Sequence, residues 1–158
     1  MKALICNEFG STKNLTLEEV KSPEPGAGQV LIDVHAAGIN FPDVLTVQGK
    51  YQFKPSLPFT PGIEVSGVIK KVGKDVKMRK VGDEVISTLQ TGAFASEVVT
   101  SENSTFLKGN MSFEQAAGFA LTYGTSYYAL KQRARLVAGE TVLVLGAAGG
   151  VGVATIQL

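Results

Sequence analysis

Hydrophobic and polar residues alternate with the two-residue period of β-strands along most of the chain before residue 109. Such stretches occupy residues 2–6, 15–20, 30–36, 64–72, 84–87, 93–100 and 105–108, and turns rich in glycine and proline separate them. Many short strands at nearly regular spacing predict a small, partly closed antiparallel barrel. The first two stretches are predicted to pair as a hairpin.

The strand expected over residues 30–36 has an apolar face and a more polar one. The pattern places Val30, Ile32, Val34 and Ala36 on the first face and Leu31, Asp33 and His35 on the second. His35 is therefore expected to face solvent or a polar rim. A histidine there needs a partner before it can act as a base or a metal ligand.

The hydrophobic period changes to that of helices after residue 111. Ser112 and Gln115 have the spacing of a capping box, which predicts a helix that continues through Phe119. A second helix is predicted from Thr122 to Leu136, with basic residues near its end, where cations suit the helix dipole. A short helical turn is also expected over residues 44–48.

A glycine-rich stretch follows, and residues 141–152 read Thr-Val-Leu-Val-Leu-Gly-Ala-Ala-Gly-Gly-Val-Gly. The apolar run through Leu145 predicts a strand buried on both faces, Gly146 begins a turn, and residues 151–158 begin a helix. A strand, a glycine turn and a helix N-terminus together form a dinucleotide-binding site. Gly149 and Gly152 match the last two glycines of G-x-G-x-x-G, while Ala147 stands at the first. The alternative is a plain turn before a packed helix.

The order of these elements predicts two domains, a barrel over residues 1–121 and the beginning of a doubly wound domain over residues 122–158. The strand over residues 141–145 would lack both neighbours, and an isolated helix over residues 151–158 would be marginal in water. We therefore expect these 158 residues to be part of a longer enzyme.

Composition narrows the class of function. The net charge is +1 and no face-wide excess of Lys and Arg is visible, so no nucleic-acid partner is expected. No apolar run reaches membrane-spanning length, which favours a cytoplasmic protein without a membrane partner. One cysteine, Cys6, and one histidine, His35, are too few for a conventional four-ligand zinc site.

Four motifs in combination resemble the medium-chain dehydrogenase/reductase superfamily. They are Ala-Ala-Gly-Ile-Asn-Phe-Pro-Asp at 36–43, Pro-Phe-Thr-Pro-Gly-Ile-Glu at 58–64, Val-Gly-Asp-Glu-Val at 81–85 and Gly-Ala-Ala-Gly-Gly-Val-Gly at 146–152. The chain is most similar to the zinc-free, zeta-crystallin-like quinone oxidoreductases. This resemblance implies a GroES-like barrel followed by the first strand, turn and helix of a Rossmann domain, and a homodimer for the full-length chain. Asn40 and Ile63 stand where zinc-dependent relatives carry a catalytic cysteine and histidine.

The resemblance also implies reduction of quinones or conjugated enones by hydride from NADPH, with NADH the less expected coenzyme. Without a metal, the acceptor must already be electrophilic. Asn40 and Tyr51 would line the pocket beside the nicotinamide, and their amide N–H and phenol O–H groups could donate to the substrate oxygen. Asn40 and Thr122 would contact the cofactor. The implied pyrophosphate-binding residues are Ala148, Gly149, Gly150, Val151 and Gly152.

Several alternatives remain open at this point. Asn40 could be an ordinary turn residue, Tyr51 a half-buried aromatic residue, and Thr122 a helix N-cap. The activity could be that of an enoyl-thioester reductase of the same superfamily. The barrel could also serve a binding or structural role without a cofactor.

Overall fold

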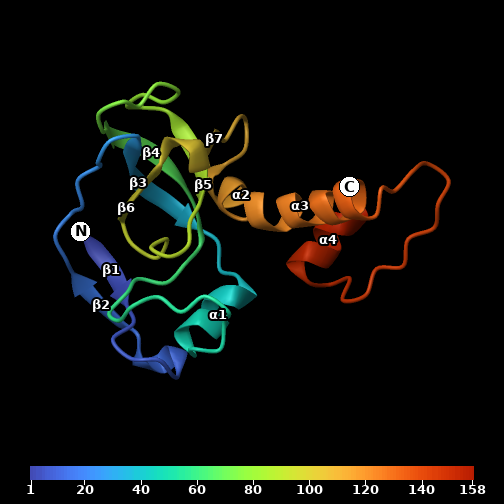
Figure 1. Ribbon diagram of the computed structural model, residues 1–158, viewed down its shortest axis with the longest axis horizontal. Coiled ribbons are helices and arrows are strands. Elements are labelled where there is room, and N and C mark those ends of the chain that lie inside the picture. Colours follow the sequence, from blue (N-terminus) through green and yellow to red (C-terminus); the bar gives the residue numbers. More distant parts are fainter. The chain divides into compact units, whose positions relative to one another are not determined.

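The computed structural model describes residues 1–158 and contains two compact units, Met1–Gly118 and Phe119–Leu158 (Figure 1). We call them the barrel unit and the helical unit. The functional boundary that we expect after residue 121 stays a prediction.

The barrel unit contains two antiparallel sheets. A hairpin pairs β1 (Lys2–Ile5) with β2 (Thr16–Glu19), as predicted. The second sheet has the order β6-β3-β4-β5-β7. Its strands are β3 (Gln29–Ala37), β4 (Glu64–Val72), β5 (Glu84–Thr88), β6 (Glu97–Ser101) and β7 (Thr105–Leu107).

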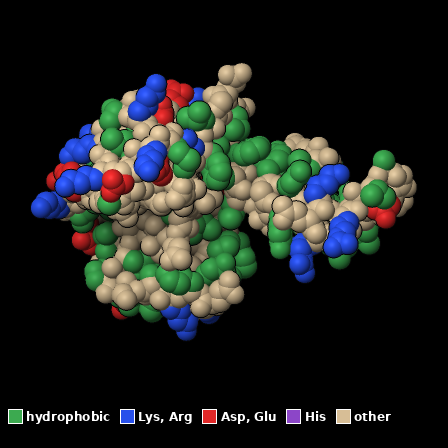
Figure 2. Space-filling model, turned by 45° about the horizontal axis from the view of Figure 1, so that its top comes forward, with side chains coloured by type: hydrophobic (Ala, Val, Ile, Leu, Met, Phe, Trp, Pro, Cys, Tyr) green, Lys and Arg blue, Asp and Glu red, His purple; other side chains and the backbone are tan.

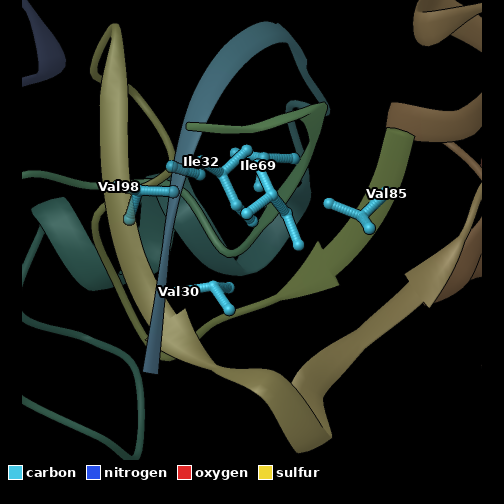
Figure 3. Packing of buried hydrophobic residues seen from close by; sticks show 7 residues of the cluster. Val30, Ile32, Ile69, Val85 and Val98 are labelled. Carbon is cyan, nitrogen blue, oxygen red and sulfur yellow. The ribbon is translucent and has the colours of Figure 1, made fainter. Parts of the chain in front are cut away.

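The larger sheet curls into the predicted partly closed barrel. The Ser87 hydroxyl on β5 donates to the Thr100 hydroxyl on β6 at 3.4 Å, although β3 and β4 lie between these strands in the sheet order. Apolar side chains from the curled strands fill the interior (Figure 3). This core comprises Val30, Ile32, Val65, Ile69, Val85, Ala93 and Val98.

Two details of the strands differ from the predictions. The strand expected from residue 93 begins at Glu97, because the backbone N–H groups of residues 92–94 donate to the loop at residues 60–62 and not to a strand. Leu31, assigned to the polar face, is fully buried, so this part of β3 is covered on both faces. His35 is exposed as predicted, and its ring packs on Phe113 with centroids 4.2 Å apart.

The barrel unit also contains short helices. They are η1 (Thr12–Asn14), α1 (Phe41–Val47), η2 (Glu102–Ser104) and α2 (Phe113–Ala117). Ser112 and Gln115 form the predicted capping box at the start of α2. This helix ends at Ala117, short of Phe119, because Gly118 leaves the helical conformation.

The helical unit consists of α3 (Ala120–Tyr127), a π-helical turn η3 (Tyr128–Arg133) and α4 (Gly150–Gln157). The predicted helix over residues 122–136 thus begins earlier and widens into a π-turn. The strand expected over residues 141–145 is not formed, and the Leu143 and Leu145 side chains are each 84% exposed. No other strand lies beside this segment to share its backbone hydrogen bonds, and a β-strand requires such a partner.

Figure 2 shows acidic and basic side chains interspersed over the visible face of the barrel unit, with hydrophobic side chains exposed between them. In the helical unit, Tyr127 and Tyr128 are about half exposed. None of the helices combines the length and the apolar character needed to cross a bilayer.

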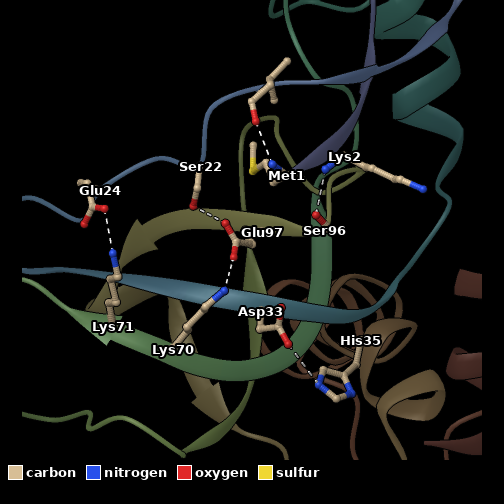
Figure 4. Close-up of polar contacts among 11 residues, drawn as sticks. Met1, Lys2, Ser22, Glu24, Asp33, His35, Lys70, Lys71, Ser96 and Glu97 are labelled. Carbon is tan, nitrogen blue, oxygen red and sulfur yellow. Dashed lines mark hydrogen bonds and ion pairs between the residues drawn. The ribbon is translucent and has the colours of Figure 1, made fainter.

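A buried carboxylate ties the segment after β2 to the large sheet. Glu97 on β6 is 8% exposed and accepts hydrogen bonds from the Ser22 hydroxyl and from the Lys70 ammonium group (Figure 4). The bond from Lys70, followed by the bond from Ser22, lowers the pKa of Glu97. Because the folded state favours the ionised carboxylate, this contribution to stability is present above the ordinary glutamate pKa of 4.5 and is lost as the pH falls further.

We expect Glu97→Gln to lower the melting temperature at pH 7 by several degrees, since the charge that strengthens the hydrogen bonds from Lys70 and Ser22 is lost. The difference from wild type should shrink as the pH falls below 4.5, because the wild-type carboxylate then becomes protonated. Thermal unfolding followed by circular dichroism between pH 3 and pH 7, roughly the range over which a glutamate titrates, measures both effects. Glu24→Gln is the control, because Glu24 forms an exposed ion pair with Lys71 at 2.7 Å and such pairs contribute little. Equal shifts for both variants would contradict the prediction.

Candidate functional site

Asn40 lies at the N-cap of α1, where its backbone is extended. The Asp43 carboxylate accepts from the Asn40 backbone N–H at 2.7 Å, which is one half of a capping box. Pro42 in the first turn suits the helix start, because its missing N–H would have no partner there. The local sequence therefore fixes the Asn40 backbone rigidly at a helix terminus.

Two buried carboxylates surround Asn40. Asp43 is 3% exposed, and its Oδ1 is the one buried side-chain polar atom in the chain without a hydrogen-bond partner. Glu64 at the start of β4 is fully buried, and its Oε2 accepts from Asn40 Nδ2 at 3.4 Å. Burial raises the pKa of Asp43, the hydrogen bond from Asn40 opposes this, and the nearby Glu64 charge raises the pKa further.

Asp43 and Glu64 both belong to the motifs at 36–43 and 58–64, although no role was predicted for either residue. Their burial, which the sequence does not show, is the feature that marks them, since a charged side chain is almost never fully buried unless it is paired. The spacing of Asn40 and Asp43 fits a capping box and could have identified that half of the cluster. Glu64 lies 24 residues further along the chain, and only the fold brings it to Asn40.

Tyr51 follows α1 after the turn at Gly49. Its backbone N–H donates to the Leu45 carbonyl at 3.2 Å, which holds the residue against the helix that Asn40 begins. The Tyr51 side chain is half-buried. Both pocket residues predicted in the barrel unit are thus carried by α1 and its flanking turns, and their roles stay predictions.

In the helical unit, the glycine turn leads directly into α4. Gly146 adopts a left-handed conformation with φ of 67°, and its carbonyl accepts from the Gly149 N–H at 3.0 Å. Gly149 is the N-cap and has no side chain that could cover the helix end. A Cβ on Gly152 would lie 2.3 Å from the Gly146 carbonyl oxygen, so only glycine permits this close packing of turn and helix.

The first turn of α4 offers unpaired backbone donors. The N–H groups of Gly150, Val151 and Gly152 have no carbonyl partner within the helix and form no other backbone hydrogen bond. Such groups, with the positive end of the helix dipole, favour an anion such as a pyrophosphate. The residues present therefore fit a dinucleotide phosphate group.

Thr122 lies near the glycine turn, as the cofactor prediction requires. A Cβ on Gly150 would meet Thr122 Cγ2 at 3.0 Å, so α3 packs closely on the start of α4. The alternative N-cap role of Thr122 is wrong, because α3 begins at Ala120 with Phe119 as its N-cap. Ser126, which the sequence analysis misses, is fully buried and donates from Oγ to the Val151 carbonyl at 2.9 Å.

Each unit also contains a cavity apart from the residues predicted to act. A cavity of about 630 Å³ in the barrel unit is lined mainly by polar side chains, including Gln29, Thr88 and Ser101, and does not include Asn40 or Tyr51. An apolar hollow of about 420 Å³ in the helical unit is lined by Phe119, Tyr123, Gly124, Tyr127 and Leu158. No group of three or more His, Cys, Asp or Glu side chains could hold a metal ion.

A profile of the family described as "Alcohol dehydrogenase GroES-like domain" matches residues 26–145. The chain belongs to this GroES-like family. It is 44% identical over 160 residues to a "Quinone oxidoreductase-like protein 2 homolog" of Nematostella vectensis, a match that covers 99% of this chain and 43% of the relative. It is 43% identical to the "Quinone oxidoreductase" of Rattus norvegicus over 162 residues, covering 100% of this chain and 49% of the relative.

Solved structures of the same superfamily align with nearly the whole GroES-like chain. The human synaptic vesicle membrane protein VAT-1 homolog-like protein gives a TM-score of 0.97 at 37% identity, covering 99% of this chain and 51% of that one. A mycobacterial protein complexed with NADPH gives 0.93 at 34% identity, covering 99% and 49%. The CurK enoyl reductase gives 0.90 at 36% identity, covering 99% and 50%.

These comparisons confirm the predicted GroES-like barrel and the resemblance to quinone oxidoreductases. The beginning of a Rossmann domain stays a prediction. The chain spans about half the length of the relatives that it matches. The strand predicted over residues 141–145 is not formed.

Proposed function

We propose that the full gene product carrying residues 1–158 reduces quinones or other conjugated carbonyl compounds with NADPH. The observation that carries the proposal is the glycine turn, whose three unpaired N–H groups at the start of α4 suit a dinucleotide phosphate. The quinone oxidoreductases among the relatives and the NADPH-complexed homologue support this choice of reaction and coenzyme.

When bound, NADPH would supply the hydride. The backbone N–H groups of Gly150, Val151 and Gly152 would hold its diphosphate. Thr122, which lies next to Gly150, would contact the cofactor beside them. The Tyr51 hydroxyl would donate a hydrogen bond to the substrate oxygen, which gains negative charge during reduction. Zinc-independence, a cytoplasmic location and a homodimer stay predictions.

An enoyl-thioester reductase is the second candidate, favoured by the similarity to the CurK enoyl reductase. Both activities deliver hydride to an acceptor in which a carbonyl group is conjugated to a carbon–carbon double bond, so the barrel residues could serve either. A third possibility, from a different class, is a cofactor-free barrel with a binding role. Binding of NADPH separates this last reading from the two enzymatic ones.

We expect the full gene product to enhance NADPH fluorescence and to oxidise NADPH in the presence of a para-quinone. The 158 residues contain no tryptophan, so they add little background to the measurement. An enone and an enoyl thioester, tested beside the quinone with NADPH and then NADH, would rank the substrate classes and the coenzymes. Absence of binding of both NADPH and NADH would reject both enzymatic candidates.

A further inference from the structure

The Asn40 side chain is bonded on its amino side to protein acceptors. Nδ2 lies 3.4 Å from Glu64 Oε2 and 3.5 Å from the Gly38 carbonyl oxygen, so two protein acceptors lie within hydrogen-bond reach of the amino group. The Asp43 backbone N–H donates to the Asn40 backbone carbonyl at 3.0 Å, and the Asn40 side-chain oxygen makes no cap hydrogen bond. The amino group of the Asn40 side chain therefore faces protein acceptors, and its oxygen does not.

Glu64 is held tightly where it meets Asn40. Gly38 allows this approach, because a Cβ at that position would lie 2.9 Å from Glu64 Oε2 and 2.3 Å from the Ala117 carbonyl oxygen. A larger residue would force the carboxylate, β3 or α2 to move. The complete burial of Glu64 leaves its side chain little freedom to turn away from Asn40.

We infer that Glu64 is a positioning residue that commits the Asn40 amino group to the protein, so that Asn40 offers a ligand only a hydrogen-bond acceptor. A carboxamide oxygen has two lone pairs, and the Asp43 N–H uses neither, because it donates to the Asn40 backbone carbonyl. The ligand group that Asn40 recognises is therefore a donor, such as an amide N–H or a hydroxyl. This inference rests on the proposed function and refines the donor role that the sequence suggests for Asn40.

The hydrogen-bond partners of Asn40 favour the same assignment. Its amino group faces Glu64 Oε2 and the Gly38 carbonyl oxygen, so it is not available to a substrate oxygen that becomes negative during hydride transfer. The side-chain oxygen attracts the positive end of an N–H or O–H bond. Stabilisation of the substrate oxygen is then the task of Tyr51, and Asn40 orients the cofactor. The nicotinamide carboxamide and the ribose hydroxyls of NADPH are the available donors.

The orientation of Asn40 can be tested without any enzymatic activity. In the 15N-labelled full gene product, the Asn40 side-chain NH2 signals are identified by their loss in Asn40→Ser. We expect their hydrogen exchange to be slower than that of exposed asparagines, because Nδ2 lies within reach of two protein acceptors. Exchange at the rate of exposed asparagines would overturn the inference, whatever the protein catalyses.

NADPH binding tests whether Glu64 affects the ligand through Asn40. We expect Glu64→Leu to weaken NADPH binding about tenfold, the effect of one lost hydrogen bond to a charged group, and Glu64→Gln to weaken it less because an acceptor oxygen remains. In an Asn40→Ala background, Glu64→Leu should cause no further loss, since Glu64 acts through Asn40. Additive losses would overturn the inference.

Glu102→Gln is the matched control for a buried glutamate. Glu102 is 8% exposed and accepts from the Lys77 and Met78 backbone N–H groups, so its loss should lower stability without changing NADPH affinity.

The 3-acetylpyridine analogue of the cofactor, which lacks the carboxamide amino group, distinguishes the carboxamide from the ribose hydroxyls as the donor to Asn40. Loss of the Asn40→Ala effect with this analogue identifies the carboxamide, and its persistence identifies a ribose hydroxyl. If the wild-type protein binds no NADPH, the proposed function fails, and the NMR experiment still decides the orientation of Asn40.

Discussion

Replacing Gly152 with alanine is expected to weaken NADPH binding by about 10- to 100-fold, the range that overpacking by a single methyl group typically causes. The added Cβ would lie 2.3 Å from the Gly146 carbonyl oxygen and 2.8 Å from Ala147 Cα. Neither backbone atom can yield as a flexible side chain would. The first turn of α4 must then separate from the glycine turn, and the three N–H donors lose their common direction. Fluorescence titration of the full gene product with NADPH measures the loss.

A second glycine of the helical unit provides the control. Gly124 lies inside α3, and a Cβ there meets no atom within 4 Å. Gly124→Ala should therefore leave NADPH affinity unchanged and stabilise the unit by about 0.5–1 kcal/mol, the difference in helix propensity. If Gly152→Ala bound NADPH as tightly as Gly124→Ala, the glycine turn would not be the diphosphate site.

Replacing Tyr51 with phenylalanine is expected to lower kcat for quinone reduction about 100-fold, the effect of removing one preorganised donor from a developing oxyanion. The KM for NADPH should change little, because the hydroxyl is proposed to act on the substrate. Steady-state kinetics with both substrates varied separates the two constants. The aromatic ring is retained, so the packing of the half-buried side chain is preserved.

Tyr128→Phe is the control for this experiment. Tyr128 lies in η3 and is half exposed, and no role in the reaction is proposed for it. Loss of one exposed hydroxyl there should leave kcat unchanged. Equal turnover by wild type and Tyr51→Phe would remove Tyr51 from the mechanism and would leave the substrate oxygen without a donor in the barrel unit.

The strands and turns of the barrel could be predicted because their signals are local. The range of β4 is the predicted one, and those of the other strands differ by a few residues. The start of β6 is the main exception. Residues 92–94 have a strand-like pattern, but their N–H groups bond to the distant loop at residues 60–62. The hydrophobic period shows which side chains are apolar, but it does not show which backbone groups form hydrogen bonds with each other.

The candidate site could be predicted only in part. The glycines of the turn were predicted from their spacing, because a phosphate-binding turn needs glycine at fixed positions. Asn40 and Tyr51 were predicted from the family resemblance, and their roles stay predictions. Asp43, Glu64 and Ser126 were missed. Each is defined by burial and by a bond to a partner, and for Glu64 and Ser126 that partner lies 24 and 25 residues away in the chain.

The amino-acid sequence by itself determined which segments are apolar, where glycine permits a turn, and where a helix is capped. These properties depend on a residue and its immediate neighbours. Only the tertiary structure decided that the apolar run at residues 141–145 remains unpaired, that Leu31 is covered on both faces, and that the amino group of Asn40 turns to Glu64. The reason is that strand pairing, burial and the direction of a side-chain hydrogen bond each require a second group, and the fold alone brings that group within reach.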